Sequence, residues 1–140
     1  MSKPLQTSEL PQFPNCFVCG SENPKGLHVR FCTTPEGVEA IFQAEPSHAG
    51  YEDVVHGGIV GALLDEAMIW ASYVSMRRFG VTAELNVRYI KPLRVRQTCT
   101  LIGRFVEDRG KLWIAEGEMI DEEGKPIARA RGKILPTDKK

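Results

Sequence analysis

The run from Gly57 to Met76, GGIVGALLDEAMIWASYVSM, is the feature that most constrains the fold. It contains no proline and is apolar on nearly every side, so it predicts one long helix. Two adjacent acids, Asp65 and Glu66, interrupt it near the middle. Because a helix that is apolar all round must be covered almost completely, the rest of the chain has to curve around it.

A helix this long and apolar could be a membrane span or the buried core helix of a folded domain. The two acids decide between these interpretations. A carboxylate at the centre of a bilayer costs about 2.5–3.5 kcal/mol. With both Asp65 and Glu66 at that depth, burial inside a folded domain is favoured. We therefore expect a core helix and no membrane partner.

The segments on either side of the helix have the patterns of strands. Val81, Ala83, Leu85, Val87 and Tyr89 alternate with polar residues, which is typical of a half-buried strand. Six strands are expected, near residues 27–33, 38–44, 81–89, 98–106, 111–120 and 125–135. Short turns join the first two and the last three, which indicates antiparallel pairing. The prediction is an α+β fold in which a curved antiparallel sheet of five to six strands wraps a long central helix.

Residues 16–140 are expected to form a single domain, because the sequence shows no internal repeat and no second region of domain-like pattern. The preceding residues, 1–15, are polar and carry Pro4, Pro11 and Pro14, so they are expected to be a flexible arm. This segment lacks the apolar stretch of a signal peptide, so we expect a cytoplasmic protein.

The charged residues balance, with 18 Lys plus Arg against 18 Asp plus Glu. Without a basic excess, nucleic acid is not expected as a partner. The charge is unevenly spread, however, with six cations between residues 77 and 96 and seven acids between residues 107 and 123. Most of these residues are expected to pair across strand faces. The alternative is that some of the cations bind a phosphate-bearing ligand.

Cys16 and Cys19 form a CxxC pair in a loop rich in Gly and Pro. Three interpretations are open: two ordinary cysteines in a tight loop, a redox pair, or half of a zinc site. A structural zinc ion usually has four ligands, so the missing two would come from a second chain or from His28 or His48. The first interpretation is favoured, and we expect no metal and no cofactor.

Asp65 and Glu66 are about 100° apart around the helix axis, so they cannot share one task. One of them is expected to face a cleft, and the other a polar partner or solvent. At the helix start, the backbone N–H of Gly57 has no acceptor inside the helix and carries partial positive charge. It is suited to hold a carbonyl oxygen or an oxyanion, although Gly57 and Gly58 equally fit a role in close packing.

These two candidate groups are too far apart to act together in one chain. Eight residues separate Gly57 from Asp65, which is about 12 Å along a helix. A reacting carbonyl needs its oxyanion donor and its base or nucleophile within about 3–3.5 Å. Two antiparallel copies of the helix could supply one group each, so we predict an obligate homodimer with two shared sites.

The sequence His56-Gly57-Gly58, with Asp65 nine positions after the histidine, resembles the hotdog-fold acyl-CoA thioesterases. The similarity covers about residues 16–135 and looks closest to the branch that contains the phenylacetate-pathway thioesterases. NCFVCG and the following NPKGL resemble one subgroup of that family. The resemblance implies hydrolysis of a small acyl- or aryl-CoA thioester. On this basis Asp65 is the nucleophile or general base, the Gly57 N–H polarises the carbonyl, and His56 orients the helix start.

The resemblance also implies a set of substrate-binding residues. They are Gly58 and Glu66 on the helix, Thr82 and Asn86 on the following strand, and Arg88 and Lys91, which together with Arg94 and Arg96 would meet the coenzyme A phosphates. The acyl group would enter an apolar slot lined by Met68, Ile69 and Trp70.

One position departs from the family pattern. The family often has Gln or Asn six residues before the histidine, where this chain has Gly50. The alternative to an enzyme is a non-catalytic hotdog domain that binds an acyl-CoA as a sensor or accessory. Either form is expected as a homodimer or as a dimer of dimers.

Overall fold

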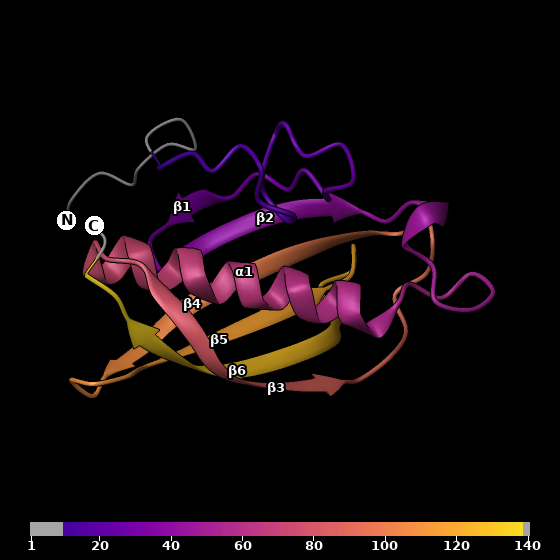
Figure 1. Cartoon of the computed structure of the whole chain (residues 1–140). Coiled ribbons are helices and arrows are strands. Elements are labelled where there is room, and N and C mark those ends of the chain that lie inside the picture. Colours follow the sequence, from indigo (N-terminus) through magenta and orange to yellow (C-terminus); the bar gives the residue numbers. More distant parts are fainter. Residues whose placement is uncertain (1–9, 139–140) are drawn as a thin grey trace.

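The long helix α1 (Gly57–Met76) lies along the concave face of one antiparallel sheet (Figure 1). The structure is a computed structural model that describes residues 10–138. The strands are β1 (Cys32–Thr34), β2 (Gly37–Gln43), β3 (Gly80–Tyr89), β4 (Thr98–Asp108), β5 (Trp113–Ile120) and β6 (Pro126–Pro136), and a short 3-10 helix, η2 (Pro46–His48), precedes α1. The predicted order of two strands, one helix and four strands is confirmed.

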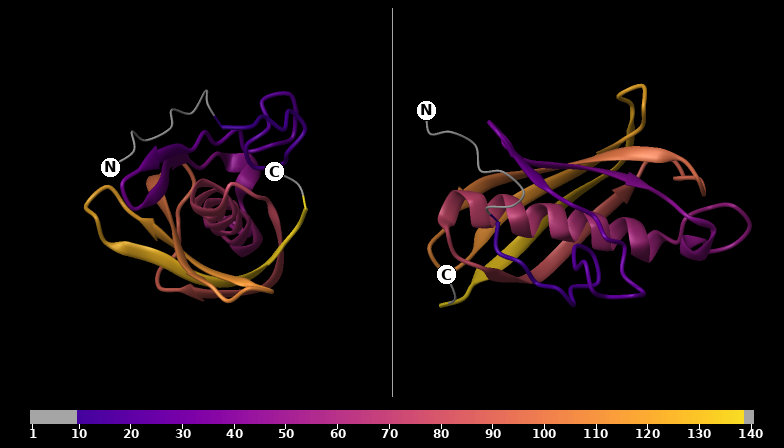
Figure 2. Two further views of the ribbon diagram at one scale, coloured as in Figure 1. Left: turned by 90° about the vertical axis from the view of Figure 1, so that its left-hand side faces the viewer. Right: turned by 90° about the horizontal axis from the view of Figure 1, so that it is seen from above.

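The sheet order is β1-β2-β4-β5-β6-β3, and every neighbouring pair is antiparallel. β4, β5 and β6 form a meander, whose turns contain Gly110 and Gly124 at φ angles of 85° and 83°. β3 precedes β4 in the chain, yet it lies beyond β6 at the edge. Seen along the helix axis, the sheet curves around α1 (Figure 2). This arrangement is the hotdog fold, and it confirms the predicted α+β architecture.

Two glycines in the middle of the sheet let α1 lie directly against it. A Cβ atom on Gly103 of β4 would sit 2.2 Å from the carbonyl oxygen of Ala67. A Cβ atom on Gly117 of β5 would sit 3.3 Å from the carbonyl oxygen of Leu64. The two glycines are partners across the strands. Helix backbone and sheet backbone therefore meet here with no side chain between them.

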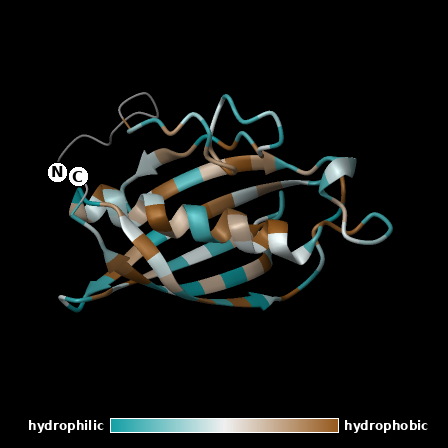
Figure 3. Cartoon of the chain, viewed as in Figure 1, coloured by the Kyte–Doolittle hydropathy of each residue, from teal (hydrophilic) through white to brown (hydrophobic). Residues whose placement is uncertain are grey.

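The hydrophobic core fills the space around this contact. Leu63, Leu64 and Met68 of α1 and Leu101, Trp113 and Met119 of the sheet are almost completely buried in one cluster. By length and composition α1 is apolar enough to cross a membrane, with a hydropathy of 1.3, but half of that stretch is buried inside the domain. Figure 3 shows hydrophobic residues along α1 that are interrupted by hydrophilic positions. The helix packs as a core helix.

The first predicted strand, residues 27–33, is for the most part not a strand. His28 has a positive φ of 53°, which interrupts the extended backbone, and β1 begins only four residues later. The N–H of Leu27 donates instead to the carbonyl oxygen of Phe17, at 2.8 Å. This segment therefore ties the CxxC loop to the domain.

β3 differs most from its predicted pattern. Its register with β6 shifts directly after Thr82, where Ala83 forms a bulge. Thr82 and Leu85 consequently both face the helix, although a simple alternation places them on opposite faces. The strand was predicted to be half-buried, yet Val81, Leu85 and Tyr89 are 61%, 38% and 54% exposed. They are exposed because β3 is the last strand at this edge of the sheet.

The predicted flexible arm, residues 1–15, falls largely on residues 1–9, which lie outside the described part of the chain. From residue 10 onward the chain packs against the domain. Leu10 is 5% exposed, and the ring of Phe13 lies 6.3 Å from the ring of Trp70, centroid to centroid. Packed structure therefore begins before the predicted domain boundary.

The close contact of α1 with the sheet predicts opposite effects for two Gly-to-Ala substitutions. Gly103→Ala should destabilise the fold by more than about 2 kcal/mol, because its Cβ overlaps the Ala67 carbonyl and two packed backbones cannot easily move apart. Gly61→Ala in α1 gives a Cβ with an ordinary contact of 3.7 Å, to the Tyr89 hydroxyl. It should stabilise the helix by about 0.5–1 kcal/mol. Urea denaturation measures both, and equal effects would contradict the contact.

Candidate active site

The first turn of α1 leaves one backbone donor without an acceptor. The carbonyl oxygen of His56 accepts the N–H groups of Ile59 and Val60, at 2.9 and 3.3 Å. The Nδ1 atom of His56 accepts the N–H of Gly58 at 2.8 Å. Within residues 10–138 the N–H of Gly57 has no hydrogen-bond acceptor. The positive end of the helix dipole is therefore presented through this one N–H.

Tyr89 of β3 fixes the other side of this turn. Its hydroxyl donates to the carbonyl oxygen of Gly57 at 2.6 Å, and its ring atoms lie 3.6 Å from where a side chain on Gly57 would begin. The edge strand thereby holds the helix start in place. Sequence reasoning missed this contact, because Tyr89 has the pattern of one more apolar residue in an alternating strand.

Asp65 and Thr82 are two candidate site residues that the structure brings together. Asp65 is half-buried, and its Oδ1 accepts a hydrogen bond from Thr82 Oγ1 at 2.6 Å. Its Oδ2 has no hydrogen-bond donor in the described part of the chain. A carboxylate that is held at one oxygen and open at the other can accept a proton, or attack an electrophile, in a fixed direction.

Glu66 points away from Asp65, in keeping with the turn of about 100° per helical residue. Its Oε2 accepts the indole N–H of Trp70 at 3.2 Å and the Sγ–H of Cys16 at 3.3 Å. Cys19 lies beside the same carboxylate, and burial, with Glu66 adding to it, raises the pKa of the Cys19 thiol far above its ordinary value. Glu66 therefore belongs to the contact between α1 and the CxxC loop, not to the Asp65–Thr82 pair.

Other candidate residues are not brought to Asp65. The Gly57 N–H lies eight residues away on the same helix, roughly 12 Å along its axis. Asn86 and Arg88 lie on the outer face of β3, because the bulge after Thr82 changes the side to which the following residues point. Thr82 and Asn86, which the resemblance placed together, are thus on opposite faces of the strand.

The candidate phosphate-binding cations are partly engaged with acids. Lys91 forms an ion pair with Asp121, and its ammonium lowers the pKa of that carboxyl to about 2. Arg94 contacts Asp53 at 2.8 Å. On the outer face of the sheet the ion pairs between β5 and β6 are Glu118–Arg129 and Glu116–Arg131, at 2.9 and 3.2 Å. The acids of β5 thus pair with cations of β6 and not with the cations of residues 77–96, from which Lys91 alone, among the ion pairs of the described residues, meets an acid of residues 107–123.

A cavity of about 360 Å³ lies beside the helix start. Gly57, Val60, Tyr89 and Lys91 are among its lining residues. Its walls are mainly apolar, and the Lys91 side chain brings a cation to it. A group in this cavity would therefore lie near Gly57 and near Lys91, whose ammonium is paired with Asp121.

A second cavity, of about 510 Å³, lies between α1 and the start of β3. Ile69, Trp70, Phe79 and Val81 line it, with Glu66 and Cys16. The lining includes these two residues but neither Asp65 nor Thr82. Met68 was expected in this apolar slot, but it lies on the neighbouring side of the helix and is 1% exposed against the sheet.

The loop position that departs from the family pattern lies directly beside the helix start. A Cβ atom on Gly50 would sit 3.3 Å from the Cα of His56. A polar side chain at this position would therefore project next to the first turn of α1, and Gly50 supplies none.

The CxxC pair gains a third member that the sequence did not indicate. The ligand atoms of Cys16, Cys19 and Glu66 all lie within 4.8 Å of one another. His28 and His48, which were considered as further ligands, are not part of this group, and both rings bond nearby backbone atoms. Glu66 was missed because it is fifty residues from Cys16 in the chain.

The cap at the start of α1 gives a stability prediction. His56→Ala removes the acceptor of the Gly58 N–H and should cost about 0.5–2 kcal/mol. His56→Asn should keep most of the stability, because asparagine also caps helices through its side-chain oxygen. The free energy of unfolding from urea titrations measures the difference. Equal stability of the wild type and the alanine variant would show that the cap contributes nothing.

Comparisons with known proteins agree with this geometry. A structure of the protein RHA08564, described as a thioesterase superfamily protein, has a TM-score of 0.80 at 23% identity and covers 87% of this chain and 60% of that chain. A hypothetical thioesterase from Streptococcus pneumoniae TIGR4, solved with coenzyme A, has a TM-score of 0.72 at 19% identity over 77% of this chain and 86% of that chain. These likenesses show the fold.

One relative is similar to this chain in sequence. An uncharacterized protein of Schizosaccharomyces pombe is 25% identical over 109 residues, which are 74% of this chain and 62% of the relative. The chain therefore spans less than two thirds of the length of this yeast protein. The family model described as thioesterase superfamily matches residues 52–128, which contain all of α1, β3, β4 and β5. Because this match covers more than half of the sequence, including both helix acids, the chain belongs to the thioesterase superfamily.

Proposed function

We propose that this chain hydrolyses a small acyl- or aryl-CoA thioester at two sites shared between the subunits of a homodimer. The observation that carries the proposal is the presence of two uncommitted groups on one helix, the Gly57 N–H and the Asp65 Oδ2. The coenzyme A bound to the streptococcal protein supports this class of ligand. The spacing from His56 to Asp65 supports a place in the phenylacetate-pathway-like branch.

The free edge of β3 supports assembly through this strand. β3 is ten residues long, and Val81, Leu85 and Tyr89 are exposed along it. A long edge strand with exposed apolar residues is a ready template for pairing with another chain. Pairing of β3 with its own copy about a two-fold axis is antiparallel and would set two α1 helices side by side in opposite directions. Gly57 of one subunit then approaches Asp65 of the other.

The chemistry needs both groups at one thioester carbonyl. Asp65 of one subunit removes a proton from water, which attacks the carbonyl carbon, or Asp65 attacks that carbon itself. The Gly57 N–H of the other subunit holds the carbonyl oxygen as negative charge develops on it. The C–S bond breaks, and the coenzyme A thiolate leaves and takes up a proton. The product is the carboxylic acid, which in the second route forms when water cleaves the anhydride between the acyl group and Asp65.

The surrounding residues suit this assignment. Thr82 occupies Asp65 Oδ1 and so directs Oδ2 toward the reacting carbon. The larger cavity, on the neighbouring flank of α1, provides an apolar wall of Ile69 and Trp70 for the acyl group. The smaller cavity is lined by both Lys91 and Gly57, and an anionic part of coenzyme A bound there would compete with Asp121 for the Lys91 ammonium.

Substitution of Asp65 tests the proposed chemistry. In a panel of acyl- and aryl-CoA esters with thiol detection, Asp65→Asn should lower kcat by about 10²–10⁴-fold, because the amide can neither accept the proton nor attack. Glu116→Gln is the matched control, since it makes the same change in an outer-face ion pair and should leave kcat unaltered. Full hydrolysis by the Asp65 variant would remove this residue from the mechanism.

Wild-type binding of acyl-CoA without turnover would favour the non-catalytic domain, for which the glycine at position 50 is the supporting observation.

A second substitution tests whether the site is shared. Gly57→Pro removes the N–H and adds ring carbons beside Tyr89. Proline is tolerated at the first helical position, and His56 already has φ −56° and ψ 132°, which suit a residue before proline. Gly57→Ala is the control that keeps the N–H. In a dimer of one Asp65→Asn chain and one Gly57→Pro chain, one shared site carries both defects and the other carries none. This mixed dimer should have about half of the wild-type activity.

The activity of the same mixed dimer can also contradict the shared site. If each site lay within one chain, every site of the mixed dimer would carry a defect and no activity would return. Purification of the mixed dimer through two different tags, followed by light scattering, establishes its composition. A wild-type protein that is monomeric at assay concentrations and fully active would also contradict the shared site.

A further inference from the structure

The CxxC loop folds back onto α1 and brings two thiols to one carboxylate. The Sγ atoms of Cys16 and Cys19 and a carboxylate oxygen of Glu66 lie within 4.8 Å of one another, and all three residues are half-buried. Ligands held at about 2.0–2.3 Å by a tetrahedral zinc ion are about 3.3–3.8 Å apart. The distance from Cys16 Sγ to Glu66 Oε2 is already 3.3 Å. Only small side-chain movements separate the cluster from the spacing of a zinc site.

The backbone of the loop is arranged around the sulfur atoms. The N–H of Cys19 points to Cys16 Sγ at 3.4 Å, and the N–H of Gly20 donates to the Cys16 carbonyl oxygen at 2.9 Å. A Cβ atom on Gly20 would sit 2.4–2.5 Å from the backbone of Pro14 and of Cys16, so no larger residue fits. An N–H aimed at a sulfur stabilises negative charge on it, which is the form that a metal ligand takes.

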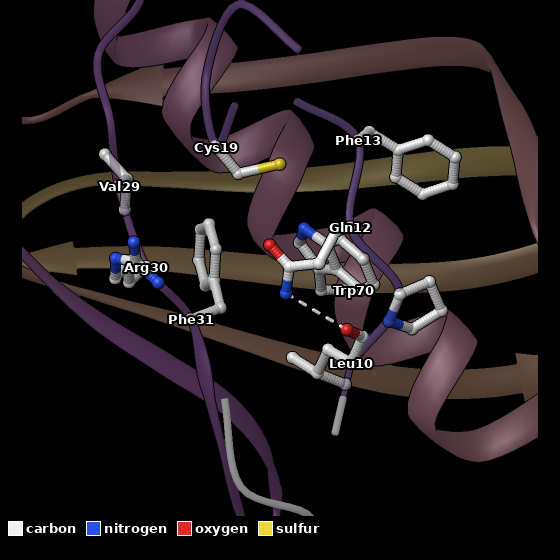
Figure 4. A pocket seen from close by; sticks show the side chains of 9 residues that line it. Leu10, Gln12, Phe13, Cys19, Val29, Arg30, Phe31 and Trp70 are labelled. Atoms are coloured by element: carbon white, nitrogen blue, oxygen red, sulfur yellow. Dashed lines mark hydrogen bonds between the residues drawn. The ribbon is translucent and has the colours of Figure 1, made fainter. Parts of the chain in front are cut away.

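A neighbouring side chain orients the carboxylate. The indole N–H of Trp70 donates to Glu66 Oε2 at 3.2 Å from one helical turn further on. Hydrogen bonds of this kind to a ligating carboxylate are typical of metal sites, because they fix the direction of the ligand. Trp70 and Cys19 also line a small cavity of about 30 Å³ between the N-terminal segment and α1 (Figure 4).

We propose that Cys16, Cys19 and Glu66 bind one zinc ion, which fastens the N-terminal segment to α1. Two thiolates with a carboxylate suit zinc, whereas calcium and magnesium prefer oxygen ligands alone. On binding, the two thiol protons pass to solvent, and three negative ligands surround the dication. The larger cavity, which is lined by Cys16 and Glu66, gives water access to the fourth position. None of the three ligands contacts the Asp65–Thr82 pair, although Cys16 and Glu66 line the cavity proposed for the acyl group, and zinc binding does not depend on the proposed hydrolysis.

Cobalt and zinc titrations of the full chain test the site. After chelation under a non-thiol reductant, Co²⁺ should bind at one ion per chain and give thiolate charge-transfer bands together with tetrahedral d–d bands, and Zn²⁺ should displace it. Cys16→Ser and Cys19→Ser should each weaken Zn²⁺ binding by at least about tenfold, and Glu66→Gln should weaken it while keeping the thiolate bands. Cys32→Ser is the control, because its thiol is exposed and bonds elsewhere.

Two measurements on the wild type keep the test independent of how the variants fold. Zn²⁺ should protect Cys16 and Cys19, but not Cys32, from alkylation as followed by mass spectrometry of peptides. Zn²⁺ should also raise the melting temperature in a concentration-dependent way, because it binds only the folded chain at this site. The proposal is overturned if the wild type binds no stoichiometric ion at micromolar Zn²⁺, if protection extends equally to Cys32, or if the two cysteines form a disulfide that takes up no metal.

Discussion

The contact between the backbone of α1 and the middle of the sheet determines the rest of this structure. At Gly103 and Gly117 no side chain separates the helix from β4 and β5, so the helix is fixed in depth and in rotation. Once this contact is made, the buried side of α1 is set, and the positions of Asp65 and Glu66 follow from the turn of the helix. Neither acid can then face the middle of the sheet at β4 and β5. Each must find a partner from a different flank, and Thr82 and the CxxC loop are those partners.

Much of the fold could be predicted from local patterns. The apolar run gave the bounds of α1, and period-two alternation with Gly-containing turns gave the meander of β4, β5 and β6. The position of β3 at the edge beyond β6 could not be predicted, because it depends on pairing between strands that are not neighbours in the chain. The bulge at Ala83 was equally hidden, since an inserted residue leaves the sequence alternation intact. The positive φ of His28, which interrupts the first predicted strand, is likewise a local backbone feature that the apolar pattern does not show.

The candidate site likewise has features that could be predicted from the sequence and features that could not. The divergence of Asp65 and Glu66 and the unpaired Gly57 N–H follow from helix geometry alone, so one sequence was enough to find them. The contact of Thr82 with Asp65 depends on the bulge in β3, and the resemblance named Thr82 as a substrate-binding candidate without indicating this contact within one chain. The bond from Cys16 to Glu66 joins a loop to a helix across fifty residues, and nothing in either segment indicates the other. Contacts within an element were therefore predictable, whereas contacts between distant segments needed the fold.

The hydroxyl of Tyr89 joins the far end of the edge strand to the carbonyl of Gly57. The peptide group on the other side of Gly57 carries the N–H for which residues 10–138 provide no acceptor, so any movement of β3 also moves this donor. In a dimer formed along β3, the β3 strands of the two subunits would pair with each other. The Tyr89 hydroxyl of each subunit would then hold the start of its own α1 in place. Dilution that separated the subunits would then loosen the donor as well as remove the opposing acid, and protein concentration would itself control the proposed hydrolysis.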